Sequence, residues 1–415
     1  MNKILFLLNN FMRKLWVRCC AFCLLAVFAI VIGPELGPYI PEKLKEMVTQ
    51  NTVEDILKIL ASSMLAVTTF SLSIMVQAFS TAATTASPRT NSLLMQNSTA
   101  QNALGAFIGA FLFSIVGIIS IGANIYHEDV IIVLFLFTIV VIAIVIIFLL
   151  KWIDQLSRLG RVSETIKTVE SALHKSIRHR AKAPFLHCRP MEHANTQKRY
   201  PLACDRIGYV QYIDIEALNN IANKKDIEIY IHVNPGKFMD SITPLVETNT
   251  QIDQTTEKNI IDTIVIGDNR TFEQDPRYGF VVLSEIALKA LSPAINDPGT
   301  AIDVIGTFIR AMRLWVDNFP ISTESEREKH EDIKYKRIYI KPIREKDVLE
   351  DIYSALIPQV SQSLHVSRHL KKSLVTIEKI GGETLSEASR EWQDLFYHHC
   401  QTCLSDKEYQ QLVEE

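Results

Sequence analysis

The sequence predicts an α-helical membrane domain with four transmembrane helices, followed by a cytosolic α+β domain. The first observation is the run VIIVLFLFTIVVIAIVIIFLL at Val130–Leu150, which contains no charge, proline or glycine. About 20 apolar residues are enough for one helix to cross a bilayer core, and a helix that is apolar on every face is typical of a membrane span. The second observation is the ordinary globular composition after Lys151. The membrane part is therefore expected over residues 1–150.

Three further apolar segments precede this run. We expect them to form helices over residues 15–32, 56–79 and 103–122, so that residues 130–150 form the fourth span. The first segment could be taken for a signal peptide. It ends in Gly33-Pro34-Glu35 without a small-residue cleavage site, so an uncleaved first helix is expected.

Basic residues gather at the two ends of the predicted membrane domain. In the loop over residues 80–102 the only lysine or arginine is Arg89, and the loop over 123–129 contains neither. The basic residues lie before the first helix and after the fourth, at Lys3, Arg13, Lys14, Lys151, Arg158 and Arg161. Because cytoplasmic segments are enriched in Lys and Arg, we expect both termini to lie in the cytoplasm, which an even number of spans permits.

Composition argues against two other classes of protein. The formal net charge of −3 gives no overall field that would attract nucleic acid. The seven cysteines are too sparse and too irregularly spaced for a secreted disulfide framework. Free thiols in a reducing cytosol fit this pattern better.

Polar side chains share one face of the second predicted helix. They follow helical spacing, at Thr69, Ser73, Gln77, Ser80 and Thr84. We call these five residues the polar stripe. In one interpretation the stripe lines a water-filled or substrate path. In the other, small hydroxylated residues let helices pack closely and hydrogen-bond across their interface.

The segment that follows the fourth helix predicts an amphipathic connector helix over residues 151–182. Its apolar residues recur at steps of three and four, at Trp152, Leu156, Leu159, Val162, Ile166, Val169, Leu173 and Ile177. Because this spacing is close to a heptad, the helix can pair with copies of itself, which favours a homo-oligomer. Packing of the helix on its own domain is the alternative.

A mixed pattern predicts the cytosolic α+β domain over residues 206–415. Residues 181–205 contain three prolines and are expected to form a loop. Strands are expected over residues 206–214, 226–233 and 260–266, with an edge strand over 337–341. Helices are expected over residues 215–225, 278–291 and 300–318, and again from residue 346 with a break at 381–382.

Two charged loops form the best candidate for a ligand or interface site. The loops over residues 268–277 and 292–303 supply Asp268, Arg270, Glu273, Asp275, Arg277, Asn296, Asp297 and Asp303. These side chains can bind an ion, an anionic ligand or a neighbouring subunit. In the structural interpretation the charges pair with one another, and Asp297 caps a helix that begins at Pro298.

Evidence for metal binding or catalysis is weak. Cys400 and Cys403 with His399 are weak zinc candidates, because a second matching ligand pair is missing and a buried helical face explains them. The sequence contains no Gly-rich phosphate loop, G-x-S-x-G or H-E-x-x-H motif. We therefore predict no catalytic residues and no cofactor, and an enzyme is disfavoured.

The soluble part contains four distinctive motifs: GYVQYID at 208–214, NPGKF at 234–238, IGDNRTFEQDPRYGF at 266–280 and ALSPAINDPGTA at 290–301. The membrane side contains FSLSIMVQAFS and SPRT (87–90). These motifs resemble those of a bacterial family of predicted membrane proteins, catalogued as a domain of unknown function (DUF2254). The resemblance covers nearly the whole chain. It implies an inner-membrane protein with several spans and a soluble domain, and it transfers no activity.

Two classes of function remain open. The first is an oligomeric inner-membrane channel or transport-type protein, with the second helix lining the path and the cytosolic domain assembling or gating it. The second is a membrane-anchored sensing or scaffold protein without transport activity. The polar stripe favours the first class, and neither a transported species nor a soluble ligand can be inferred from the residues.

The predicted orientation can be tested with topology reporters. A reporter fused after Glu415 should report cytoplasm, and reporters inserted near Pro38 or His127 should report periplasm, because an even number of spans separates two cytoplasmic termini. A reporter that places Glu415 in the periplasm would contradict this orientation.

Overall fold

The protein consists of two compact units. A computed structural model describes residues 15–36, 48–90, 93, 98–123, 128–158, 160–191, 198–202, 204–319 and 333–414. The first unit, which we call the membrane unit, comprises Met1–Thr84 and Asn91–Glu164. The second, which we call the C-terminal unit, comprises Thr85–Thr90 and Thr165–Glu415. A short segment that follows a membrane helix therefore belongs to the C-terminal unit.

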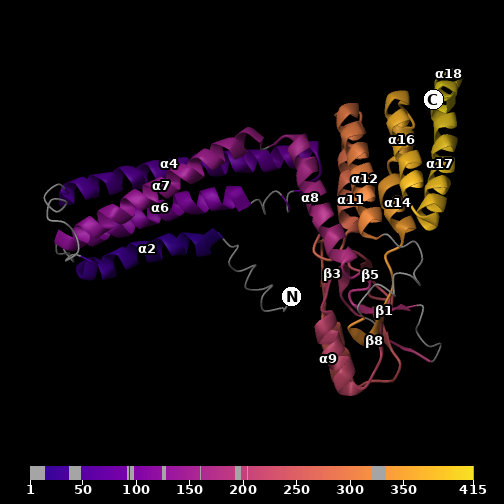
Figure 1. The fold of residues 1–415 in the computed structure, drawn as a ribbon, viewed down its shortest axis with the longest axis horizontal. Coiled ribbons are helices and arrows are strands. Elements are labelled where there is room, and N and C mark those ends of the chain that lie inside the picture. Colours follow the sequence, from indigo (N-terminus) through magenta and orange to yellow (C-terminus); the bar gives the residue numbers. More distant parts are fainter. Residues whose placement is uncertain are drawn as a thin grey trace. The chain divides into compact units, whose positions relative to one another are not determined.

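The membrane unit contains four long helices in the described residues (Figure 1): α2 (Leu15–Leu36), α4 (Gln50–Thr85), α6 (Ser98–Gly122) and α7 (Glu128–Arg158). Within those residues, three helical segments are long and apolar enough to cross a membrane: Gln50–Thr85, Thr99–Gly122 and Val130–Arg158. They correspond to the predicted second, third and fourth spans. The predicted first span forms helix α2, and its crossing of the membrane stays a prediction.

Small residues let the membrane helices approach one another closely. A side chain at Gly109 of α6 would overlap the ring of Phe22 in α2. A Cβ at Gly117 would lie 2.9 Å from Cδ1 of Leu57 in α4. Side chains from all four helices form one apolar core, which includes Ala26, Leu57, Phe107, Phe113 and Leu134.

Helix α4 is covered by its neighbours along only part of its length. In its most apolar window 28% of the residues are buried, compared with 56% in α6. Its first half packs into the core through Val53, Leu57, Leu60 and Met64. Beyond Met64, only Ser71 and Ala82 are buried in α4, all of which the structure describes. The second half of α4 therefore leaves most of its surface uncovered.

The predicted connector segment lies on two helices instead of one. Helix α7 continues to Arg158, and a turn at Gly160, with φ of 83°, separates it from α8 (Val162–Ala181). Trp152 belongs to the core of the membrane unit, and Leu159 lies outside the described residues. On α8 the apolar residues Ile166, Val169, Leu173 and Ile177 are buried. One chain therefore covers this row, as the alternative interpretation expected, without a second copy.

A five-stranded sheet has the order β1 (Cys188–Pro190), β8 (Tyr335–Ile340), β4 (Ile229–Ile231), β6 (Val246–Thr248) and β2 (Tyr200–Leu202). β8 pairs in parallel with both β1 and β4. The strand predicted at residues 337–341 is therefore confirmed as β8, but its predicted place at the edge of a sheet is wrong. β1 comes from the proline-containing segment that was expected to be a loop, and a three-residue strand is too short to show alternation.

A three-stranded sheet has the order β5 (Phe238–Asp240), β3 (Ile207–Ile213) and β7 (Ile264–Gly267). The predicted strand over 206–214 and helix over 215–225 are confirmed as β3 and α9 (Ile215–Lys225). α9 begins where it does because the side chain of Asp214 accepts a hydrogen bond from the amide of Ala217 at 3.0 Å. A further helix, α10 (Gln254–Ile261), precedes β7.

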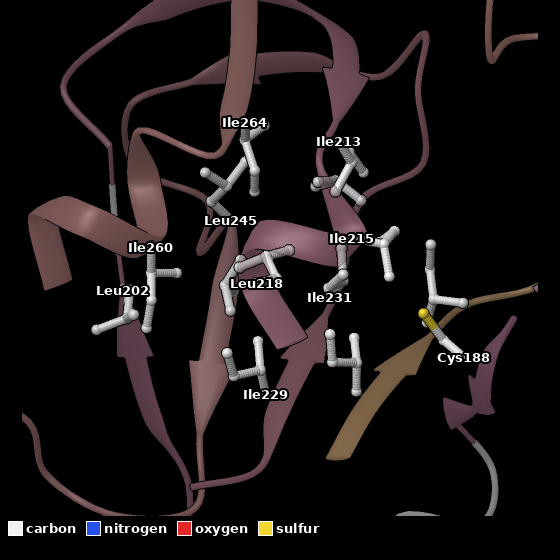
Figure 2. Close-up of a cluster of buried hydrophobic side chains, with 14 of the residues drawn as sticks. Cys188, Leu202, Ile213, Ile215, Leu218, Ile229, Ile231, Leu245, Ile260 and Ile264 are labelled. Atoms are coloured by element: carbon white, nitrogen blue, oxygen red, sulfur yellow. The ribbon is translucent and has the colours of Figure 1, made fainter. Parts of the chain in front are cut away.

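The two sheets and α9 enclose one apolar core (Figure 2). Ile229 and Ile231 of β4 belong to this core. The intervening Tyr230 lies on the other face of the sheet, where it is also buried and stacks on Tyr339 of β8. Leu218 of α9 completes this part of the core. Burial of such branched side chains is the main driving force for folding here.

The rest of the C-terminal unit is helical (Figure 1). Its helices are α11 (Arg277–Leu291), α12 (Pro298–Asn318), α14 (Glu345–Tyr353), α15 (Ile357–Val360), α16 (Leu364–Ile380), α17 (Glu383–Cys403) and α18 (Asp406–Glu414). The helices predicted over 278–291 and 300–318 are confirmed as α11 and α12. A 3-10 turn, η2 (Pro88–Thr90), follows α4 in the chain and belongs to this unit.

The turn at residues 234–236 gives a stability test. Gly236 has φ of 92°, and a side chain there would overlap the carboxylate of Asp275 and approach the guanidinium of Arg270. We expect G236A to destabilise the protein by more than about 1 kcal/mol, because both the backbone and the space exclude a methyl group. The measurement is thermal unfolding of the detergent-solubilised protein.

The matched control is G306A, in the middle of α12. A Cβ at Gly306 would meet its nearest neighbour, Arg310 Nη1, at an ordinary 3.7 Å. This substitution should keep or raise stability, by about 0.5–1 kcal/mol, because Gly is unfavourable inside a helix. Equal melting temperatures for G236A and G306A would contradict the constraint at Gly236.

Candidate functional site

The polar stripe lies on the uncovered part of α4. Thr69, Ser73, Gln77, Ser80 and Thr84 are all exposed in the isolated chain. Two of the hydroxyls donate to carbonyls of their own helix: Thr69 Oγ1 to Ala66 O at 2.9 Å, and Thr84 Oγ1 to Thr81 O at 2.9 Å. The side-chain amide of Gln77 makes no hydrogen bond within the described residues. Within the described residues, the stripe is therefore not covered by the other helices of the same chain.

The charged loop over residues 268–277 divides into a buried ion network and an exposed part. Asp268 and Glu273 are exposed. Arg270 Nε donates to Asp275 Oδ2 at 2.8 Å, and Arg277 Nε donates to Asp351 Oδ2 of α14 at 2.6 Å. The side chain of Asp275 is 2% exposed. Burial raises its pKa, and the paired Arg270 opposes this effect.

Side chains of the same loop also bind the backbone of β3. Gln274 Oε1 accepts from the amide of Ile213 at 2.9 Å, and Gln274 Nε2 donates to the carbonyl of Ile213 at 3.3 Å. In the reverse direction, the side chain of Gln211 in β3 donates from Nε2 to the loop carbonyl of Asn269 at 2.8 Å. These bonds satisfy backbone groups of β3 and of the loop, so much of this motif has a structural role.

The loop over residues 292–303 contains a helix cap. Asp297 Oδ1 accepts from the amide of Thr300 at 3.1 Å, and Asp297 Oδ2 accepts from its hydroxyl at 2.7 Å. These hydrogen bonds lower the pKa of Asp297. Pro298 is the first residue of α12, so the predicted cap is confirmed. Asn296, with φ of 47°, and Asp303 are exposed, and a ligand at this loop stays a prediction.

The two charged loops do not form a single site. They lie at opposite ends of α11, which has 15 residues. At a rise of 1.5 Å per residue the two ends are about 20 Å apart. The eight candidate residues therefore fall into two separate groups, one near each end of α11.

The weak zinc candidates do not assemble a metal site. Cys400 is buried on α17, and its thiol lies 3.5 Å from Ser361 Oγ. Burial raises the pKa of Cys400, whereas Cys403 is exposed. Among the described residues, no group of three or more His, Cys, Asp or Glu side chains could hold a metal ion.

A contact that the sequence analysis missed joins η2 to α11. Ser87 Oγ donates to Glu285 Oε2 at 2.9 Å, and the guanidinium of Arg89 donates to Glu285 Oε1. The amide of Arg89 donates to Ser87 Oγ at 3.2 Å, which orders the two donors. We call Ser87, Arg89 and Glu285 the Glu285 clamp. All three belong to the C-terminal unit.

The signals for the clamp were present in the sequence but could not be connected. Arg89 is the single basic residue of its loop and lies in the SPRT motif. Its partner Glu285 is 196 residues away and lies on a helix whose pattern indicates only burial. Periodicity reports which face of a helix is buried, not which distant segment binds to it.

The family can now be stated. The sequence model of a family described as "Predicted membrane protein (DUF2254)" matches residues 12–376. The chain belongs to this family. The match includes the four membrane-unit helices, the Glu285 clamp and both charged loops.

Individual relatives are similar to the chain over a short segment. This DUF2254 protein is 58% identical over 40 residues to the uncharacterized proteins Rv1290c of Mycobacterium tuberculosis and Mb1321c of Mycobacterium bovis. The segment covers 10% of this chain and only 8% of each relative's length. No solved structure matches the chain.

The cap at Asp297 can be tested by substitution. D297A removes an N-cap, which typically costs about 1 kcal/mol, and so should lower the melting temperature by about 2–4 °C. D297N should be close to wild type, because Asn caps as well as Asp. D303A, which removes an exposed carboxylate from the same helix, serves as the control. Identical melting of D297A and D303A would show that the cap contributes nothing.

Proposed function

We propose that this DUF2254 protein is an oligomeric inner-membrane channel or transport-type protein. Helix α4 lines the path, and the C-terminal unit gates it. The main support is the exposure of all five residues of the polar stripe on the least covered candidate membrane helix. Polar groups are costly in hydrocarbon, so the stripe is best accommodated beside water or beside another copy of the protein.

In this proposal the protein has four spans, of which α2 is the first, and both termini lie in the cytoplasm. The Glu285 clamp supports part of it. Residues 85–90 belong to the same compact unit as residues 165–415, which supports placing the loop after α4 and the chain after α7 on one side of the membrane. Helices α6 and α7 then cross as a pair and return the chain to that side.

An enclosed path requires more than one copy of the chain. The stripe occupies one face of one helix, so a closed lumen needs several stripes arranged around a symmetry axis. The apolar row of α8 is buried within its own chain and is not free for this contact. The second half of α4, which the other described helices leave mostly uncovered, is the surface available for assembly.

The proposal predicts which positions of α4 contact water. In a variant without native cysteines, single cysteines at Ser73 and Gln77 should react with a membrane-impermeant thiol reagent. Cysteines at Leu72 and Met75, on other faces of the helix, should react much more slowly. Purified protein in liposomes should also conduct ions, and Q77L should reduce the flux, because it replaces the longest polar side chain of the stripe.

The same measurements identify the alternative. If all four cysteines are equally protected and liposomes show no flux, the stripe packs against protein, and the spans only anchor a sensing or scaffold domain. Reaction at Ser73 and Gln77 together with flux would exclude that alternative.

A further inference from the structure

The segment η2 is fixed firmly on the C-terminal unit. Ala86, Ser87 and Thr90 are buried, and Thr90 Oγ1 donates to the carbonyl of Ser87 at 2.6 Å. A segment with buried residues and internal hydrogen bonds behaves as part of the unit that it packs on, not as a flexible tether.

The link from this segment to α4 is short. Helix α4 ends at Thr85, and Ser87 follows after one intervening residue. Two peptide units span at most about 7 Å, so little slack separates the clamp from the end of the helix. A displacement of Ser87 therefore passes directly to the helix that contains the polar stripe.

The acceptor of the clamp lies on a helix that is also bound on another face. Ser284, next to Glu285 in the sequence, donates to the carbonyls of Asp351 at 3.0 Å and Ile352 at 3.2 Å in α14. Arg277, two helical turns earlier on the same face, binds the carboxylate of Asp351. α11 thus connects α14 to η2.

The ion pair in the clamp is partly hydrated. The side chain of Arg89 is 53% exposed and that of Glu285 is 25% exposed. Ion pairs at such positions contribute little to global stability. The pair can therefore open and close without unfolding η2 or α11, unlike the buried pair of Arg270 and Asp275.

We infer that the Glu285 clamp is the latch through which the C-terminal unit controls α4. This inference rests on the proposed function, since it assigns the regulation of the path that α4 lines. With the clamp closed, α11 restrains the end of α4. With the clamp open, η2 stays folded but loses its bonds to Glu285, so α11 holds the end of α4 less tightly and restricts the conformations of the path less.

The test is a charge exchange measured by ion flux in liposomes. R89E and E285R each break the pair and place like charges together, so both should raise flux, by on the order of fivefold or more, a typical coupling between sites. The double variant R89E/E285R restores opposite charges and should return flux to the wild-type level. E285Q, which keeps an acceptor for Ser87 but loses the charge, should give a smaller increase.

The control is an ion pair of similar exposure elsewhere in the same unit. Arg313 and Asp317 of α12 pair at 3.0 Å, with side chains 60% and 49% exposed. R313E and D317R should leave flux unchanged. The melting temperature of each variant shows whether it folds. E285Q is the mildest change, so it still tests the clamp if R89E or E285R fails to fold.

The outcomes separate this inference from the proposed function. Wild-type flux that does not respond to R89E, E285R or E285Q, or that the double variant does not restore, overturns the latch and leaves the channel. An absence of flux in wild-type liposomes overturns the proposed function and the latch with it. In the liposome-reconstituted S87C/E285C variant, a disulfide between the two cysteines should hold the clamp closed. Flux that stays at the wild-type level in the oxidised variant would support the latch independently.

Discussion

The buried carboxylate of Asp275 fixes the point at which the sheets and the helices of the C-terminal unit meet. It pairs with Arg270, accepts from the amide of Arg277 at 3.1 Å, and lies against Gly236 in the turn after β4. Loss of one partner of a buried ion pair strongly destabilises a protein. The turn after β4, the 268–277 loop and the start of α11 must therefore keep their relative positions. Because α11 begins at Arg277, this junction also determines where Ser284 and Glu285 lie.

The consequence is that one helix links three parts of the structure. The N-terminal end of α11 is held by the Asp275 junction, one face binds α14 through Ser284, and another binds η2 through Glu285. Gly236 therefore contributes to the position of α11, and through α11 to the position of Glu285, as well as to its own turn. A shift at this end of α11 would be transmitted along a rigid helix.

Much of the fold was predictable, for identifiable reasons. The long apolar runs of α4, α6 and α7 and the alternation in β3 are strong signals, because burial imposes a period over many residues. The strands β1, β2, β5 and β6 have three residues each, too few for a period, and the prolines of β1 and β2 argue against strands. The interior place of β8 in its sheet depends on pairing with β1 and β4, which are distant in sequence, so the local sequence could not show it.

The candidate sites were predictable to different degrees. The cap at Asp297 and the pairing of Arg270 with Asp275 depend on residues close in sequence, so local chemistry indicated both. The shared face of the polar stripe also followed from helical spacing, but its exposure depends on where α2, α6 and α7 pack. The pairing of Arg89 with Glu285 depends on the complete fold, and no local rule could indicate it.

The exposure of α4 has a further geometric consequence. Ser62 is exposed and lies two helical turns before Thr69, so it continues the face of the polar stripe. From Ser62 to Thr84 the helix rises about 33 Å at 1.5 Å per residue, and a hydrocarbon core is about 30 Å thick. One turn before Ser62, Lys58 pairs with Glu54 at 2.6 Å. The hydrophilic edge of α4 thus matches the full depth of a bilayer, with a charged pair beyond one end and the basic Arg89 beyond the other.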